Sequence, residues 1–227
     1  MALSAVLLKV YEPALLPSSC HWCAPPALDA EVRNALVWRD GARLADALST
    51  AVDAAVPVSA LGYLLLSSSS GGNLNAGLVD SLLVAEAAAG ALLLNQIVKY
   101  LAGRERPYAF FGNDLGYPES EDDLSFYSGH ASFAFSVVAA TVTVAAMRGY
   151  PGAGIAAGVG FTLAAGVGYL RLAADQHYLT DVLVGSAAGG LVGWAVPRIF
   201  HPPSSPAPAS SPAARLRTPP VGLAFAF

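Results

Sequence analysis

Three short clusters of residues between positions 99 and 181 combine side chains that could together bind and transfer a phosphoryl group. They supply three fixed cations, two imidazoles and one carboxylate, together with a serine and a glycine. Arginine and lysine bind phosphate-like oxyanions, and a histidine supported by a carboxylate can act as a nucleophile. This inventory predicts a site that holds such an anion and passes its phosphoryl group through a histidine. The cluster residues are Lys99, Arg106, Ser128, Gly129, His130, Arg171, His177 and Asp181.

The first cluster consists of Lys99 and Arg106, whose spacing corresponds to about two turns of a regular helix. The planar guanidinium matches phosphate oxygens, and the ammonium supplies a point charge. Taken alone, such a pair is more typical of cations that mark the end of a membrane helix. Arg104 and Glu105 lie between them, and we expect both to be solvated and to carry no role.

The second cluster, Ser128-Gly129-His130, immediately precedes an apolar segment that we expect to be helical. Backbone N–H groups at a helix N-terminus, with a glycine that permits close approach, favour a bound anion. The alternative, purely structural role of Ser128 is that of an N-cap residue, for which serine is typical. His130 ordinarily titrates near neutrality, so it is the candidate general acid for a leaving oxygen.

The third cluster places His177 and Asp181 four residues apart, on one face of an expected helix. A carboxylate bonded to one ring nitrogen fixes the tautomer and leaves the other nitrogen as the nucleophile. Arg171 precedes this pair, and we expect Asp175 only to balance its charge. By itself a His–Asp pair at this spacing is more often structural, so the functional interpretation depends on the three clusters together.

The composition is that of a membrane protein or of an unusually apolar helical bundle. Of the 227 residues, 55% are hydrophobic and only 12% are charged, whereas a soluble domain carries roughly 25% charged residues. The mean hydropathy is +0.52. The net charge of −4 and the lack of a basic stripe argue against a nucleic-acid partner.

Several apolar stretches are close in length to the roughly 17–25 residues that a membrane-spanning helix needs. They predict an all-α helical bundle, integral to the membrane, with five or six spanning helices, the sixth depending on residues 1–16. In such a bundle the successive crossings bring all three clusters to the same face of the membrane. The expected segments are an amphipathic helix over 29–48, an apolar segment over 54–69 leading into a Ser/Gly-rich loop over 67–72, a helix over 77–102, a polar loop over 103–127, and uncharged stretches over 131–147, 149–170 and 182–197.

The sequence also divides into three regions and contains one cysteine motif. We expect an N-terminal segment over 1–28, a helical domain over 29–200 and a disordered Pro/Ser/Ala-rich tail over 201–227. Cys20 and Cys23 could form a disulfide, a redox pair or half of a metal site, and a local disulfide or two buried thiols is the more typical outcome. The acidic loop around Asp122 lacks the spacing of an EF-hand, so we expect it to be solvated.

Taken together, the clusters resemble the three signatures of the type-2 phosphatidic acid phosphatase superfamily, which also contains bacterial acid phosphatases and vanadium haloperoxidases. The family signatures are K-x6-RP, P-S-G-H and S-R-x5-H-x3-D. The spacing inside the first and third is kept throughout. In this chain they read Lys99-x6-Arg106-Pro107, Tyr127-Ser128-Gly129-His130 and Leu170-Arg171-x5-His177-x3-Asp181.

The resemblance implies a role for each matching residue. His177 would form a phosphohistidine, Asp181 would orient it, and His130 would be the general acid. Tyr127 stands where the family has proline and Leu170 where it has serine, departures that bear on substrate preference more than on catalysis. The family phosphatases use no metal. The phosphate oxygens would be held by Lys99, Arg106, Ser128, Gly129 and Arg171.

We therefore expect an integral membrane phosphatase that acts on a lipid phosphate or diphosphate without a cofactor. The alternatives are a soluble or peripheral acid phosphatase of the same superfamily, a vanadium haloperoxidase, and a catalytically silent membrane scaffold. The resemblance places the site at the cell membrane, facing the periplasm or the exterior. The arginines on the two expected faces are balanced, so the positive-inside rule does not decide the orientation.

Overall fold

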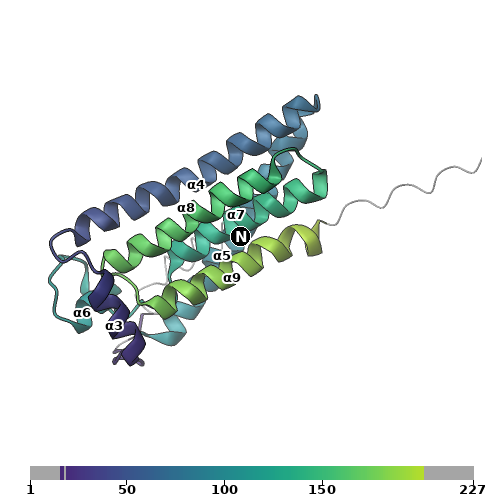
Figure 1. The fold of residues 1–227 in the computed structure, drawn as a ribbon. Helices are drawn as coiled ribbons and strands as arrows, with labels where there is room; N and C mark the ends of the chain where they lie inside the picture. Colours follow the sequence, from purple (N-terminus) through teal and green to yellow (C-terminus); the bar gives the residue numbers. More distant parts are fainter. Residues whose placement is uncertain (1–15, 18, 202–227) are drawn as a thin grey trace, which may run out of the picture.

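The computed structural model describes residues 16–17 and 19–201. Five long helices run alongside one another, and the short helices α3 and α6 lie at one end of this bundle (Figure 1). Each of the five is long and apolar enough to cross a membrane. The elements are α3 (Ala27–Leu36), α4 (Ala42–Ser70), α5 (Leu74–Ala102), α6 (Pro107–Phe110), a 3-10 turn (Glu119–Glu121), α7 (Gly129–Arg148), α8 (Ala153–Ala173) and α9 (Leu179–Phe200).

These helices confirm the predicted all-α bundle with at least five spans. The helix expected over 77–102 begins three residues earlier, and the three uncharged stretches lie within α7, α8 and α9 or at their ends. The polar loop expected over 103–127 contains the short helix α6 and the 3-10 turn. The described residues do not include 1–15 or 202–227. The predicted sixth span and the predicted tail beyond residue 201 therefore lie outside them.

Helix α7 lies at the centre of the bundle, where it contacts α4, α5, α8 and α9. A helix that is covered on all sides must be apolar all round, which explains why residues 131–147 carry no charge. Val137 and Val144 of α7 pack in one core cluster with Leu64 of α4, Val84 of α5 and Val167 of α8. The core of the protein therefore forms around α7.

Three glycines of α9 let this helix approach α7 closely. They are Gly185, Gly189 and Gly193, spaced by four residues and therefore on one face of α9. A Cβ atom at Gly185 would lie 2.6 Å from the carbonyl oxygen of Ser128, and one at Gly189 would lie closer still to the carbonyl of Ser132. Small residues at such a spacing are typical of close helix contacts in membranes. The stripe sets α9 against α7 at the end that carries the second and third clusters.

Two of the expected segments differ from the structure. The helix expected over 29–48 breaks between α3 and α4, where the backbone N–H of Trp38 donates to the carbonyl of Ala173 at the end of α8 (3.0 Å). The Ser-rich stretch expected as a loop is helical up to its last serine. There the hydroxyls of Ser68, Ser69 and Ser70 donate to carbonyls three residues earlier, so the helix and not a loop satisfies them.

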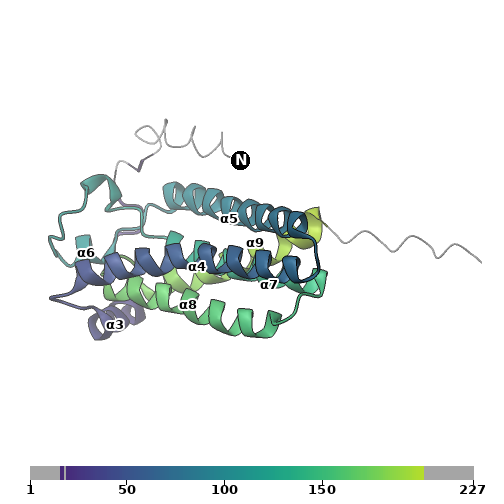
Figure 2. The ribbon, with the colours of Figure 1, turned by 90° about the horizontal axis from the view of Figure 1, so that it is seen from above.

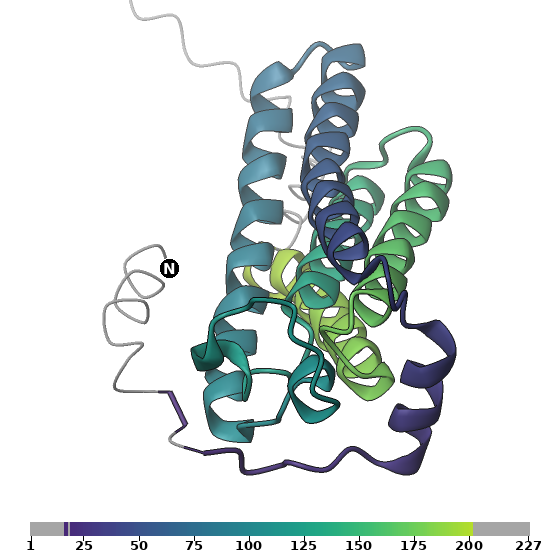
Figure 3. The same cartoon turned by 90° about the vertical axis from the view of Figure 1, so that its left-hand side faces the viewer.

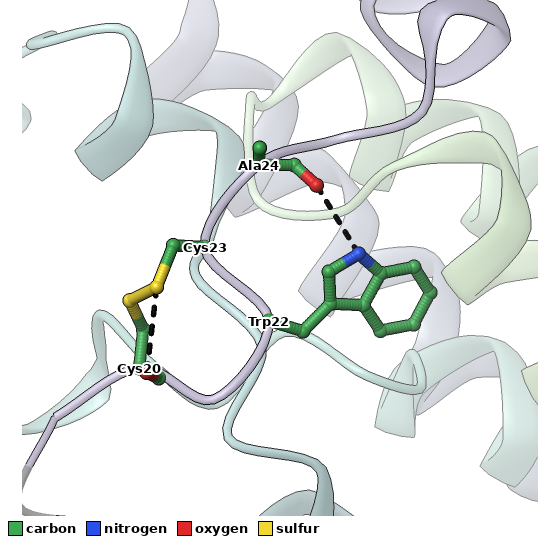
Figure 4. The surroundings of a disulfide bond; sticks show 4 residues. All are labelled: Cys20, Trp22, Cys23 and Ala24. Atoms are coloured by element: carbon green, nitrogen blue, oxygen red, sulfur yellow. Dashed lines mark hydrogen bonds between the residues drawn. A yellow bond between two sulfur atoms is a disulfide. The ribbon is translucent and has the colours of Figure 1, made fainter.

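Residues 19–41 and the loop 103–128 together form a cap over one end of the bundle (Figures 2 and 3). In the cap, the backbone N–H of His21 donates to the carbonyl of Gly103 (2.8 Å), and Trp22 pairs with Arg104 in an isolated β-bridge. Cys20 and Cys23 are joined by a disulfide (Figure 4), the first of the outcomes that their spacing allowed.

All three clusters lie at the cap end, where α5 and α8 end and α7 and α9 begin (Figure 3). The opposite end is closed by a separate polar contact. There Asp80 of α5 is fully buried and accepts hydrogen bonds from the guanidinium of Arg148 (2.7 and 2.9 Å) and the hydroxyl of Tyr150 (2.7 Å). The two ends of the bundle therefore have independent polar networks.

Candidate active site

His177 lies in the short connection between α8 and α9 and is only 1% exposed. Burial lowers the pKa of its imidazole, and the charges of Arg106, Arg171, Lys99 and His130 lower it further, well below the ordinary value. The ring is therefore neutral at neutral pH. Because these four groups come from the three clusters, the structure brings members of all three around one imidazole.

The two cations of the first cluster lie on either side of the end of α5 in the sequence. Lys99 lies in the last turn of α5, and Gly103, with a φ of 48°, ends that helix in the left-handed conformation. The chain then reverses towards Arg106, which is 5% exposed. The Nη1 of Arg106 donates to the side-chain oxygen of Gln176 (2.6 Å) and to its carbonyl (3.2 Å), and Nε donates to the carbonyl of Glu121 (2.9 Å). The guanidinium is thus fixed to the residue that directly precedes His177.

Arg171, in the last turn of α8, is held by α4. Its Nη1 donates to the carboxylate of Asp46 and to the hydroxyl of Ser49 (3.0 Å), while its buried Nε has no hydrogen-bond partner. The hydroxyl of Tyr117, in the cap loop, donates to the other oxygen of Asp46 (2.8 Å). Asp46 therefore links a cation of the site to the cap.

The prediction that Asp175 balances Arg171 is wrong. Asp175 instead accepts two hydrogen bonds from Arg33 of α3 (2.6 and 2.7 Å) and one from the amide of Asn113. Its place in the sequence, near both Arg171 and His177, suggested the wrong partner because α3 packs against this loop in three dimensions.

The second cluster forms the first turn of α7. The Ser128 hydroxyl caps the helix by accepting from the N–H of Ala131 (3.4 Å), and His130 follows in the same turn with its side chain partly exposed. A Cβ atom at Gly129 would lie 2.9 Å from the side-chain oxygen of Asn95, so a larger residue here would displace the Asn95 amide. The amide of Asn95 donates to the carbonyl of Tyr127 (2.7 Å), which fixes the turn that proline fixes in the family signature.

Asp181 lies in the first turn of α9 and is fully buried. Its Oδ2 accepts from the backbone N–H of Tyr178 (2.9 Å) and from the hydroxyl of Ser125 (2.6 Å), and its Oδ1 accepts from Nη1 of Arg104 (2.5 Å). Oδ2 also faces Nδ1 of the neutral His177 ring at 3.7 Å, which is too long for a hydrogen bond.

The prediction that Arg104 is solvated is also wrong, since its side chain is 1% exposed. It pairs with two buried carboxylates, those of Asp29 and Asp181. Within the part of the chain that the structure describes, no group of three or more His, Cys, Asp or Glu side chains is placed to hold a metal ion.

Comparison with known proteins identifies the family of this chain. The model of the PAP2 superfamily matches residues 80–204, more than half of the chain and all three clusters. The chain belongs to the PAP2 superfamily. No curated protein matches its sequence.

A solved structure is similar to this PAP2 protein in fold. It is the crystal structure of a transmembrane PAP2-type phosphatidylglycerolphosphate phosphatase from Bacillus subtilis, with a TM-score of 0.52 at 19% sequence identity. The match covers 86% of this chain and 92% of the other. The described residues include five apolar spans, so this PAP2 protein is a membrane-spanning helical bundle. At the level of the family its function is that of a phosphatase.

Four residues that hold the PAP2 site together were not predicted from the sequence. Asp46 and Ser49 do carry a signal, since they are polar residues one turn apart on an apolar spanning helix. Ser125 and Gln176 carry none, because each contacts its partner only after the loops fold. The contact of Ser125 with Asp181, for example, joins residues 56 positions apart.

Proposed function

We propose that this protein is a metal-independent phosphatase that hydrolyses a lipid phosphate or diphosphate through a phosphohistidine on His177. One observation carries the proposal: a buried imidazole, held neutral by its surroundings, has three cations from separate elements acting on it. A neutral imidazole is a nucleophile, and three cations suit the oxygens of a phosphate group. A purely structural histidine needs no such set of charges.

In the first half of the reaction, Lys99, Arg106 and Arg171 hold the phosphoryl oxygens. Nδ1 of His177 faces Asp181, so Nε2 attacks phosphorus as the bond from phosphorus to the leaving oxygen breaks. The negative charge of the bound phosphate offsets the cations around His130, so its imidazole can carry a proton, which it gives to that oxygen. Asp181 then balances the positive charge that develops on the phosphorylated ring.

In the second half, water attacks the phosphorus of the phosphohistidine. His130, now neutral, takes the proton of this water, and the bond between phosphorus and Nε2 breaks. Inorganic phosphate leaves, His177 is again neutral and His130 again carries its proton. The cycle therefore needs no metal ion and consumes one water for each phosphate released.

The membrane setting supports a lipid substrate over a soluble ester. The site lies at the end of five spans, and an apolar groove of about 390 Å³ opens between α4, α5 and α7. Phe133, which lines this groove, lies about one helical turn from His130 along α7. The similar Bacillus subtilis structure is that of a phosphatidylglycerolphosphate phosphatase, which supports phosphatidylglycerol phosphate as the first substrate to test. Phosphatidate and a polyprenyl diphosphate are the other lipid substrates to compare.

The disulfide supports a site that faces the periplasm or the exterior. Cys20 and Cys23 lie in the cap, at the same end of the bundle as the three clusters. Disulfides persist in oxidising compartments and are rare in the cytosol. We therefore assign the cap to the outer face of the cell membrane.

Phosphate release by the detergent-purified protein tests the proposal. Lipid phosphates and one soluble ester are assayed with EDTA present, beside His177→Asn and the exposed control His21→Asn. We expect release that survives EDTA, an acid-labile phosphoenzyme in the wild type, and neither in His177→Asn. Release that needs a divalent metal, or that persists in His177→Asn, contradicts the mechanism. Bromide oxidation by vanadate-loaded protein would instead indicate a haloperoxidase, and inactivity in every assay would indicate a scaffold.

A further inference from the structure

Arg104 joins two carboxylates that come from distant parts of the chain. Its Nη1 donates to Asp181 (2.5 Å) and to the hydroxyl of Thr180 (2.8 Å), both at the start of α9. Its Nη2 donates to Asp29 of α3 (2.7 Å). A guanidinium presents its donors in a rigid planar fork, so one side chain can fix both carboxylates at once.

Asp29 completes this network from the other side. Its two oxygens accept from the backbone N–H (3.0 Å) and the hydroxyl (2.6 Å) of Thr180. These bonds satisfy donors in the first turn of α9, next to Asp181. Without Arg104, Asp29 and Asp181 would be two buried carboxylates without a shared counter-charge, and burying unpaired charges is unfavourable. The orientation of Asp181 therefore depends on Arg104.

Two aromatic rings enclose the same guanidinium. Its central carbon lies 3.9 Å from the ring centroid of Trp22 and 4.4 Å from that of Tyr178. Trp22 lies between the two cysteines of the disulfide, and its indole N–H donates to the carbonyl of Ala24 (3.1 Å), which fixes the ring (Figure 4). The disulfide turn thus places a rigid aromatic face over Arg104.

We propose that Arg104 is a positioning residue for Asp181 and that Trp22, held by the disulfide turn, keeps Arg104 in place. The inference rests on the proposed function, in which Asp181 faces Nδ1 of His177 while Nε2 attacks. Arg104 and Ser125 hold the carboxylate on either side, so that Oδ2 is directed at the imidazole. The disulfide turn of the cap is in this way part of the support of the nucleophile.

The test compares Arg104→Lys, Arg104→Gln and Trp22→Leu with the wild type in detergent. The matched control is Arg148→Gln, which removes a hydrogen-bonded Arg–Asp pair at the opposite end of the bundle. Substrate phosphate is held by other cations, so the Arg104 variants should lower kcat and leave KM close to the wild-type value. Loss of an outer residue that orients a metal ligand typically costs about 10- to 100-fold in activity, and we expect a loss of similar size for Arg104.

We expect Arg104→Lys to retain more activity than Arg104→Gln, since lysine keeps the charge but loses the fork. Trp22→Leu should lower kcat by a smaller factor, and all three should slow formation of the phosphoenzyme in rapid-quench experiments. Arg148→Gln should lower the unfolding temperature without changing kcat.

An unchanged kcat in folded Arg104→Lys or Arg104→Gln overturns the inference, as does an equal loss of kcat in Arg148→Gln. If both Arg104 variants fail to fold, Trp22→Leu decides, because Trp22 is only partly buried; a wild-type kcat in that variant overturns the inference. A wild-type protein that releases no phosphate contradicts the proposed function instead, so the two failures are distinguishable.

Discussion

Nδ1 of His177 lies 3.7 Å from Oδ2 of Asp181, one helical turn further along the chain, and has no hydrogen-bond partner. The same Oδ2 accepts from the backbone N–H of Tyr178 and so caps α9. One carboxylate therefore both starts a spanning helix and faces the imidazole that follows α8. The contact must shorten by about 0.5 to 1.0 Å to become a hydrogen bond, and the charge that develops on the phosphorylated ring would favour this movement.

Asp181→Asn should lower kcat by at least about 100-fold, because an amide cannot balance the charge of a phosphorylated imidazole. Ser125→Ala removes one hydrogen bond to the same carboxylate and keeps its charge, so its loss should be much smaller. Steady-state kinetics and the amount of phosphoenzyme measure both effects. Wild-type kcat in Asp181→Asn would show that the 3.7 Å contact has no part in the reaction.

Acid should destabilise the protein through His177. In the unfolded chain its imidazole takes up a proton near pH 6.5, whereas burial and the surrounding cations keep the pKa in the fold well below that value. Since the unfolded state binds more protons in this interval, the free energy of unfolding falls as the pH falls below about 6.5. One group contributes at most about 1.4 kcal/mol per pH unit. Thermal unfolding between about pH 7 and pH 5 measures the slope.

The variant His177→Asn isolates this contribution, because asparagine does not titrate. Its unfolding temperature should fall less steeply with acid than that of the wild type. Parallel slopes for wild type and His177→Asn would mean that His177 takes up protons equally in the folded and unfolded states.

Asp46 should compete with phosphate for Arg171. Its carboxylate is paired with that guanidinium, so Asp46→Asn leaves more of the positive charge for a bound anion. For a partly exposed pair the effect is on the order of 1 kcal/mol, which corresponds to roughly fivefold tighter inhibition by orthophosphate or vanadate. Asp40→Asn, which removes an exposed carboxylate of the neighbouring cap, is the control. Weaker inhibition in Asp46→Asn would show that Asp46 instead holds Arg171 in its binding position.

Alanine at Gly189 should lower the stability of the protein, whereas alanine at its neighbour Gly190 should not. A methyl group at Gly189 would overlap the backbone of Ser132 and force α9 away from α7, and overpacking of this kind typically costs about 1–3 kcal/mol. At Gly190 the added carbon meets nothing within 4 Å, so Gly190→Ala should be neutral or stabilise the helix by up to about 1 kcal/mol. Unfolding temperatures compare the two variants. Equal values would mean that the glycine stripe does not set the α7–α9 contact.

The sequence by itself determined which segments form the apolar spans and which residues belong to the three clusters. Helix formation in an apolar segment follows from local periodicity and length, which is why α5, α7, α8 and α9 agree with expectation to within a few residues. The alternation of the spans then required all three clusters to lie at one end. The four-residue spacing also predicted that Asp181 faces His177, although His177 lies just before α9 and not within this helix as expected.

Only the tertiary structure decided which charges pair. Arg104 meets Asp181 across 77 positions, Arg171 meets Asp46 across 125 and Arg33 meets Asp175 across 142. Neighbours in the sequence suggested a solvated Arg104 and an Arg171–Asp175 pair, and both suggestions were wrong. The physical reason is burial: a charge removed from water must find a counter-charge, and the partner that it finds is set by how the cap packs on the helix ends and not by distance along the chain.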